Sequence, residues 1–432
     1  MRYFSTRDPE RKAPASLSEA AFTSLAPDGG LFLPECFPAA DLAEVERLAG
    51  ISYASMARYL AGLIFGDDVP AGKLDAIVAD AYPFDAPLAE IGDGLRTLQL
   101  FHGPTFAFKD FGARFMGRMM GFLNDGGQDI TVLTATSGDT GSAVAQGFWK
   151  VPGVKVVVLY PDGKVSDFQE AQMTTLGENI FPLRVNGTFD DCQALVKAMF
   201  SDADLRSRVR ITSANSINIL RWIPQSFYYF YGWAQWKKAT GKDSPDIVVP
   251  SGNYGNITAG MLAWKMGLPV RRFIAAANAN DVVPRFLGGE PYRPQPSVAT
   301  VANAMDVGAP SNFERMTALF GGDEAAIRSA VSGWSWTDAQ IREGIAELYR
   351  RCGYVSDPHS ATGYLSLKAS GADGFWLSTA HAAKFTQVVE AAVGRAPSLP
   401  EEFRRIASLP RRSEPMAASP AALKAYLAAG RK

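Results

Sequence analysis

From about residue 93 onward, short apolar and β-branched runs alternate with amphipathic stretches. Helical spacing, often followed by a glycine or proline, covers 142–150, 167–176, 190–200 and 257–266. The clearest strand candidates are 130–134, 155–160, 246–250, 272–277 and 374–378, several of them apolar throughout. Strands of this kind are buried on both faces, and helices join them in parallel order. The alternation therefore predicts an α/β fold.

The length of 432 residues exceeds what one compact core usually supports, so we expect two or three domains. Residues 1–90 carry short helical patterns broken by a Pro-Gly turn at 26–30, which indicates an α-rich opening domain. The last segment, 391–432, is richer in proline and arginine, and we expect it to pack on the outside of the molecule.

Charge and cysteine content narrow the class of protein. The 43 basic residues nearly balance the 44 acidic ones, so a nucleic-acid partner is not expected. Cys36, Cys192 and Cys352 are far apart and odd in number, which favours a reducing compartment over a disulfide framework or a zinc site. No run of about 20 apolar residues occurs, so we predict a cytoplasmic protein that does not enter a membrane. His102, His359 and His381 lack metal-binding spacing, and no metal is predicted.

Two glycine-rich loops follow predicted strands and open predicted helices, where open α/β sheets place their ligands. The loop 251–256, SGNYGN, could hold a phosphate on its backbone amides at the helix N-terminus. The loop 136–141, TSGDTG, offers hydroxyls and a carboxylate. Taken alone, either loop could simply be a chain reversal or a helix cap.

One lysine, Lys109, is embedded among four phenylalanines in the run FHGPTFAFKDFG, 101–112. Apolar surroundings disfavour the ammonium form, so the amine is a candidate nucleophile or imine former. The alternative is a lysine whose stem packs on Phe108 or Phe111 while its charge reaches water. Asp110, beside it, is expected to orient the neighbouring backbone or to pair with a charge.

The order and spacing of GPTFAFKDFGARF, TATSGDTG and SGNYGN resemble the pyridoxal-phosphate enzymes of the tryptophan-synthase β-subunit fold type. Within that group, SLAPDGGLFLP, SANSINILRWIPQ, TVANAMDVGAPSN, GYVSDPHSATGY and STAHAAKF are similar to segments of the threonine synthase family. The resemblance implies fold type II, with two sheet domains flanking a cleft. It places the large cofactor domain at 91–125 and 226–390 and a small mobile domain at 126–225, with 391–432 as a C-terminal extension.

The resemblance also implies the cofactor, pyridoxal 5'-phosphate, and the residues that hold it. Lys109 forms an imine with the cofactor and later acts as the catalytic base. The phosphate cradle comprises Gly252, Asn253, Tyr254, Gly255 and Asn256. Asp139 faces the cofactor's 3' oxygen, and the hydroxyl of Thr379, or of its neighbour Ser378, meets the pyridine nitrogen. Without the resemblance, Thr379 could be the N-cap of a helix beginning near His381.

The implied substrate is O-phospho-L-homoserine, which reacts with water to give L-threonine and phosphate. Asn215, Ser216 and Arg221 match the anchor for the substrate phosphate, with Thr140 near the substrate carboxylate or phosphate. An arginine suits this role because its planar fork meets two phosphate oxygens. From the residues alone, Asn215 and Ser216 could instead cap a helix, and Arg221 could be a surface charge on it.

Rival functions remain open at this point. Another enzyme of the same fold type, such as a phospholyase or a serine or threonine dehydratase, would release ammonia and a keto acid. A non-catalytic cofactor-binding homologue is the rival of another class, although intact Lys109, Thr379 and Arg221 weigh against it. The sequence leaves monomer and homodimer equally open.

Overall fold

The computed structural model describes residues 1–124 and 127–430, and its N-terminal part is not purely helical. Strands β1 (Tyr3–Ser5) and β2 (Phe32–Pro34) form a small antiparallel sheet beside the helices. The expected domain boundary at 125/126 and the last two residues lie outside the described part. The helices of this region are α1 (Leu17–Thr23), α2 (Leu42–Ala49), α3 (Tyr53–Phe65) and α4 (Ala71–Ala81).

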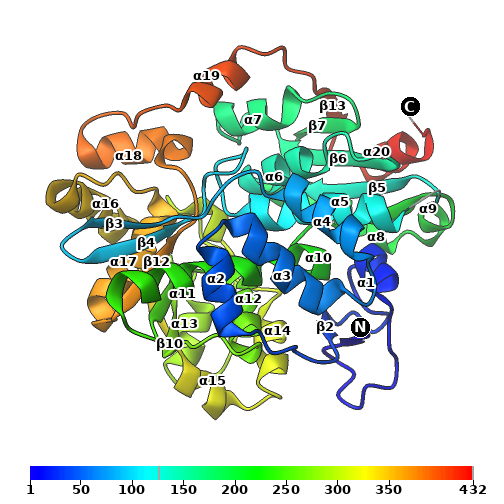
Figure 1. Ribbon diagram of the computed structural model, residues 1–432. Helices are drawn as coiled ribbons and strands as arrows, with labels where there is room; N and C mark the ends of the chain where they lie inside the picture. Colours follow the sequence, from blue (N-terminus) through cyan, green and yellow to red (C-terminus); the bar gives the residue numbers. More distant parts are fainter. Residues whose placement is uncertain (125–126, 431–432) are drawn as a thin grey trace.

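The larger of the two main sheets has six strands in the order β11-β10-β9-β12-β4-β3. The pairs are parallel except for β3 and β4, which form an antiparallel edge. The strands are β3 (Leu88–Gly92), β4 (Leu95–Gln99), β9 (Asp246–Pro250), β10 (Arg272–Ala277), β11 (Val331–Ser335) and β12 (Gly374–Ser378). The central strands are almost entirely buried, because helices cover both faces (Figure 1).

The helices associated with this sheet include the two that open beside the expected site, α5 (Lys109–Leu123) and α12 (Gly255–Lys265). Helix α5 also packs extensively against α6 (Asp139–Phe148), a helix beside the second sheet, so α5 lies between the two layers. The others are α10 (Ile219–Trp222), η1 (Ile223–Ser226), α11 (Phe227–Thr240), α13 (Val282–Leu287), η2 (Asn303–Met305), α14 (Phe313–Leu319), α15 (Glu324–Ala330), α16 (Asp338–Cys352) and α17 (Pro358–Ser370).

The smaller main sheet has five parallel strands in the order β13-β7-β6-β5-β8. Its inner strands are apolar, and α7 begins with a capping box in which Ser166 and Gln169 satisfy each other's backbone amides. The elements are β5 (Ile130–Ala135), α6 (Asp139–Phe148), β6 (Val154–Pro161), α7 (Asp167–Thr174), β7 (Ile180–Asn186), α8 (Phe189–Ser201), α9 (Ala203–Arg208) and β8 (Arg210–Thr212).

The C-terminal tail, 391–432, lies on the outside of the molecule as expected, since most of its described residues are exposed or half-buried, and it also adds an edge strand to the small sheet. In Figure 1 it arches from α18 over the top of the molecule to the far side. It contributes β13, which pairs with β7, and it buries Leu423 in the core beneath α8. The tail contains α19 (Glu401–Ala407), β13 (Glu414–Ala417) and α20 (Pro420–Ala428), and it is preceded by η3 (Ala382–Phe385) and α18 (Thr386–Val393).

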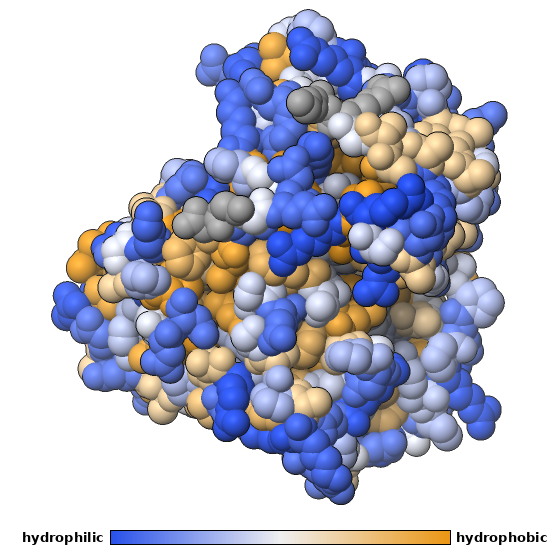
Figure 2. Space-filling view, turned by 90° about the vertical axis from the view of Figure 1, so that its right-hand side faces the viewer, coloured by the Kyte–Doolittle hydropathy of each residue, from blue (hydrophilic) through white to orange (hydrophobic). Residues whose placement is uncertain are grey.

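The strand predictions for 246–250, 272–277 and 374–378 are confirmed residue for residue as β9, β10 and β12. Those for 130–134 and 155–160 fall within β5 and β6, and the α/β class is confirmed. None of the helices among the described residues is long and apolar enough to cross a bilayer. Figure 2 shows a face whose projecting parts are hydrophilic, while apolar residues gather in its recessed middle.

Candidate functional site

Lys109 is the first residue of α5, and the loop before it is tied to the end of β12. The Phe108 amide donates to the Thr379 carbonyl at 2.9 Å, and the His381 amide donates to the Phe106 carbonyl at 3.0 Å. Phe106 has a left-handed φ of 58°, which turns the chain into the helix. The structure thus brings the lysine loop and the Ser378–Thr379 segment together, although they are far apart in sequence.

Asp110 fixes the other side of the same loop. Its carboxylate accepts from the Thr105 amide at 2.8 Å and from the Thr105 hydroxyl at 2.7 Å. The expectation that Asp110 orients neighbouring backbone is confirmed. Gly103 lies so close to this carboxylate that a Cβ there would approach an oxygen at 2.5 Å, so the turn requires glycine.

The electrostatic setting of Lys109 favours a neutral amine. Burial lowers the pKa of Lys109 to about 8; the negative charge of Asp139 opposes this shift, while the charges of Arg221 and Lys384 add to it. Part of the side chain stays accessible, as expected for a residue in the wall of a site that ligands enter. The lowered pKa weighs against the alternative in which the lysine simply extends its charge to water.

The loop Gly252–Asn256 joins β9 to α12 and presents an uncapped helix N-terminus. Tyr254 adopts a left-handed φ of 60°, and no side chain caps the first amides of the helix. A Cβ on Gly252 would lie 2.5 Å from the Met305 Cα, so the backbone here approaches a neighbouring loop closely. The amides are available to an anion.

Asn256 has an unused donor in this cradle. Its side-chain oxygen accepts from the hydroxyls of Tyr228 and Tyr229 at 2.6 and 2.7 Å. Among the described residues its buried Nδ2 has no acceptor. A buried amide nitrogen without a partner is unusual in proteins. The phosphate fit of the cradle rests on the free backbone amides at the start of α12.

Ser216 links the cradle to the second predicted binding segment. Its hydroxyl accepts from the Asn253 side chain at 2.8 Å and from the Asn312 side chain at 3.0 Å. Asn215, next to it, is half-buried and accepts from the Thr134 hydroxyl at 3.4 Å. The N-cap of α10 is Asn218, so the alternative in which Asn215 and Ser216 cap this helix was wrong.

Arg221 is buried, and the alternative of a surface charge was also wrong. Its Nη1 donates to the Ala214 carbonyl at 2.8 Å, and burial lowers the pKa of Arg221 to about 10. A Cβ on Gly112 would lie 2.4 Å from the Arg221 carbonyl, so α5 and α10 meet closely one helical turn from Lys109. Among the described residues, Asp110 is the carboxylate whose charge acts on this guanidinium.

Ser378 and Thr379, the two hydroxyl candidates, differ in their surroundings. The Ser378 hydroxyl is engaged with the Thr97 hydroxyl at 2.8 Å and the Tyr354 hydroxyl at 3.1 Å. Thr379 is held through its backbone, with its amide donating to the Ser360 hydroxyl at 2.8 Å. The cap of the following helix, η3, is His381, so the alternative of Thr379 as that cap was wrong. Thr379 is the better candidate for a ligand contact.

Asp139 and Thr140 open α6 in the small sheet's layer. Asp139 is buried, and its carboxylate accepts from the Gln169 side chain at 2.8 Å and pairs with Lys384 at 2.8 Å. Burial tends to raise the pKa of Asp139, but the charges of Lys384 and Lys109 hold it well below its usual range. Thr140 is half-buried beside it.

Three polar residues near the site were missed at the sequence level. Lys384 is completely buried, and Asn312 and Arg315 brace the Ser216 segment. Lys384 and Asn312 stand in motifs that resemble the family, STAHAAKF and VGAPSN, but their partners are distant in sequence. The one signal in the sequence that could have pointed to Lys384 is its position among apolar neighbours, in AAKF.

Comparison with known proteins agrees with this geometry. A family model described as pyridoxal-phosphate dependent enzyme matches residues 90–375. The structure of pyridoxal-phosphate-bound threonine synthase from Brucella melitensis superposes with a TM-score of 0.93 at 32% identity and covers 99% of each chain. The fold and the site define a pyridoxal-phosphate-dependent enzyme of fold type II. Models of the N terminus and C-terminal part of threonine synthase match residues 2–82 and 361–427. The chain belongs to the threonine synthase family.

Two comparisons with Escherichia coli support that membership over the full length. Threonine synthase of strain K12 is 41% identical over 427 residues, which is 98% of each chain. The crystal structure of threonine synthase from Escherichia coli superposes with a TM-score of 0.89 and covers 100% of both chains. The C-terminal tail that completes the small sheet is thus included in the similarity.

Proposed function

We propose that this protein converts O-phospho-L-homoserine and water to L-threonine and phosphate. The observation that carries the proposal is Arg221, a buried guanidinium beside Lys109 with a single hydrogen bond to protein among the described residues. A guanidinium has five N–H donors, so most of those of Arg221 remain available to a ligand. A phosphate ester bound next to the reactive amine fills them in bidentate fashion.

The residues of the site fit the cofactor. The amides of Gly252–Asn256 would hold its phosphate, and Lys109 would bond to it. The hydroxyl of Thr379, with Ser378 as the neighbouring alternative, would meet its ring nitrogen, and Asp139 would face its 3' oxygen. When bound, pyridoxal phosphate supplies an aldehyde that bonds to amines and a conjugated ring that draws electrons from the substrate's α carbon.

In the proposed reaction the free amine of Lys109 acts as the base. It takes a proton from the α carbon and later one from the β carbon of the substrate, and the C–O bond to the γ-phosphate breaks. The hydroxyl of a water molecule adds at the β carbon, and the remaining proton of that water goes to the released phosphate. The two protons taken from carbon are returned to the substrate, one to the γ carbon, which becomes the methyl group, and one to the α carbon. A neutral amine is required for the first step, and the pKa of about 8 keeps a useful fraction neutral near physiological pH.

The substrate is oriented by residues of the small-sheet layer and the adjoining segment. Arg221, Asn215 and Ser216 bind the phosphate, and Thr140 binds the substrate carboxylate or phosphate. We further propose that the layer at 126–225 closes over the large domain, 91–125 and 226–390, to exclude water until the addition step. Cys36, Cys192 and Cys352 are all free thiols, which supports placing the reaction in the cytoplasm.

The test is to incubate the purified protein, loaded with cofactor, with O-phosphohomoserine and to quantify products. We expect equal amounts of phosphate and threonine, and a change in the cofactor's visible absorbance. Lys109→Ala should abolish both. Phosphate accompanied by ammonia and a keto acid would support a phospholyase instead, and the absence of phosphate release would leave a non-catalytic homologue.

A further inference from the structure

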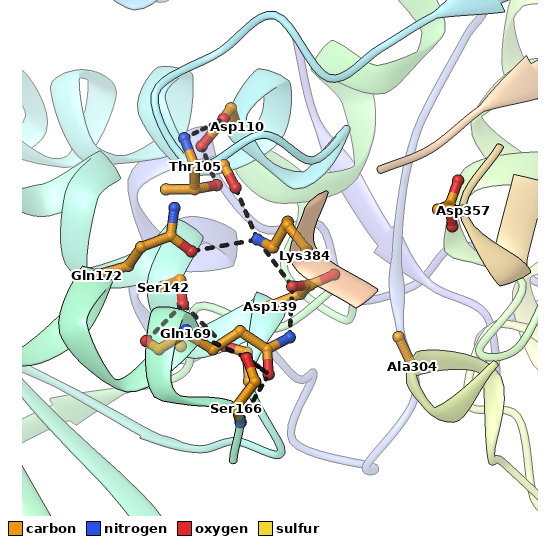
Figure 3. A network of polar contacts seen from close by, with 12 residues as sticks. Thr105, Asp110, Asp139, Ser142, Ser166, Gln169, Gln172, Ala304, Asp357 and Lys384 are labelled. Carbon is orange, nitrogen blue, oxygen red and sulfur yellow. Dashed lines mark hydrogen bonds and ion pairs between the residues drawn. The ribbon is translucent and has the colours of Figure 1, made fainter. Parts of the chain in front are cut away.

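Lys384 is a buried ammonium whose three donors are all used. Its Nζ donates to the Thr105 carbonyl at 2.6 Å and to the Gln172 side-chain oxygen at 3.2 Å, and it pairs with the Asp139 carboxylate at 2.8 Å. Figure 3 shows the three acceptors around this nitrogen. An ammonium has three donors, so this one is satisfied without any ligand. Its function therefore lies in what it holds.

The three acceptors come from three separate elements. Lys384 itself follows β12 of the large sheet, Asp139 and Gln172 lie on α6 and α7 of the small sheet's layer, and Thr105 belongs to the loop that presents Lys109. Thr105 in turn donates to Asp110, the residue after Lys109. One buried cation thus joins both layers to the lysine loop.

Two cations, Lys384 and Lys109, compete for the carboxylate of Asp139. Both Lys384 and Lys109 act on its charge, whereas its remaining contact, Gln169, is a neutral amide. The charged groups acting on Lys109 are Asp139 on α6, Arg221 on α10 and Lys384 on η3. Asp110 acts on Arg221. If Lys384 were neutral, Lys109 would remain as the cation paired with a buried carboxylate.

We infer that Lys384 is a positioning residue for the chemistry of Lys109. Its buried ion pair with Asp139 keeps that carboxylate from pairing with the Lys109 amine. An uncompensated Asp139 stabilises the protonated amine, which can neither bond to a carbonyl carbon nor remove a proton. The inference deepens the proposed function, since it rests on the role given there to Lys109.

The experiment is a pH titration of the visible absorbance of the full-length, cofactor-loaded protein, in which the Lys109 nitrogen is bonded to the cofactor as an imine. Protonation of this nitrogen changes the absorbance, and a nearby carboxylate favours the protonated imine as it favours the protonated amine. In Lys384→Met, a neutral residue of similar length, the midpoint should move upward by about one to three pH units. In the double variant Asp139→Asn/Lys384→Met both charges are gone, and the midpoint should return to within about half a unit of the unsubstituted protein. Lys368→Met is the matched control, because Lys368 pairs with Glu347 on the surface, and it should not move the midpoint.

An unchanged midpoint in Lys384→Met would overturn the inference. If that variant does not fold, the comparison of Asp139→Asn with the double variant decides: the first keeps an unpaired Lys384 charge and should titrate at lower pH, and equal midpoints overturn the inference. Lys109→Ala separates the two proposals. If its absorbance titrates like that of the unsubstituted protein, the proposed role of Lys109 fails, not merely the role of Lys384.

Discussion

Two buried arginines, Arg221 within the segment 213–222 and Arg315 packed against that segment, differ in how many acceptors surround them. Arg315, on α14, donates to four oxygens, of Ser216, Ile217, Asn312 and Phe32, and lies over the Trp222 ring. Arg221 donates to one, the Ala214 carbonyl, among the described residues. Burial lowers the pKa of both side chains, to about 9 for Arg315 and about 10 for Arg221.

The different number of protein acceptors distinguishes a structural arginine from a ligand-binding arginine around one short segment. A guanidinium whose terminal nitrogens already donate to four protein oxygens fixes the fold around it, although the buried Arg315 Nε has no partner among the described residues. A guanidinium that makes a single bond to protein keeps most of its donors for a ligand. Such a cation is retained where a ligand completes it. The comparison assigns Arg315 to the shape of the site and Arg221 to the substrate.

The largest expected effect is that of Arg221→Ala on turnover. Removing one partner of a buried ionic contact costs several kcal/mol, so kcat/KM for O-phosphohomoserine should fall by about 100-fold or more. Cofactor content should not change, because the cradle Gly252–Asn256 is built by other residues. Steady-state kinetics with cofactor quantification checks this, and equal loss of cofactor and of substrate binding would show that Arg221 is misassigned.

The matched substitution Arg315→Met should act on stability first. Four oxygens lose a donor, two of them carbonyls of the segment that carries Ser216, so the free energy of unfolding should fall by about 2 kcal/mol. Chemical denaturation measures it. If Arg315→Met kept its stability but lost substrate affinity as completely as Arg221→Ala, the two arginines would not have different roles.

A smaller effect is expected on pH dependence. Lys109 must be neutral to act as a base, so kcat should rise with pH and level off above about 8, where its pKa lies. The Arg221 charge contributes to lowering that pKa, so Arg221→Ala should move the midpoint upward by less than about one unit, while Arg315→Met should leave it in place. A downward shift in Arg221→Ala would contradict the electrostatics described above.

Local pattern was enough to predict much of the fold and half of the site. The apolar runs fixed β9, β10 and β12 because buried parallel strands have few residue choices, and Lys109 stood out against its phenylalanines. The loop SGNYGN was equally visible from its position after a strand. Each of these features lies within a run of consecutive residues, so it can be recognised without knowing the fold.

What could not be predicted depends on contacts between distant segments. Lys384 meets Thr105 across 279 positions, and Arg315 reaches the carbonyl of Phe32 across 283. The strand β13 joins the small sheet only because β7 leaves an edge to pair with, and its four residues carry no strong strand pattern. Burial of Arg221, likewise, follows from the close approach of α5 at Gly112 and not from its own neighbours.

The most direct test of the account compares two ligands that differ only in the phosphate. Binding of O-phosphohomoserine and of homoserine is measured by the cofactor's absorbance in the unsubstituted protein, Arg221→Ala and Arg315→Met. We predict that Arg221→Ala removes the preference for the phosphorylated ligand and leaves homoserine binding unchanged, while Arg315→Met keeps the preference. A preference that persists in Arg221→Ala would contradict the claim that the unfilled guanidinium is the phosphate anchor.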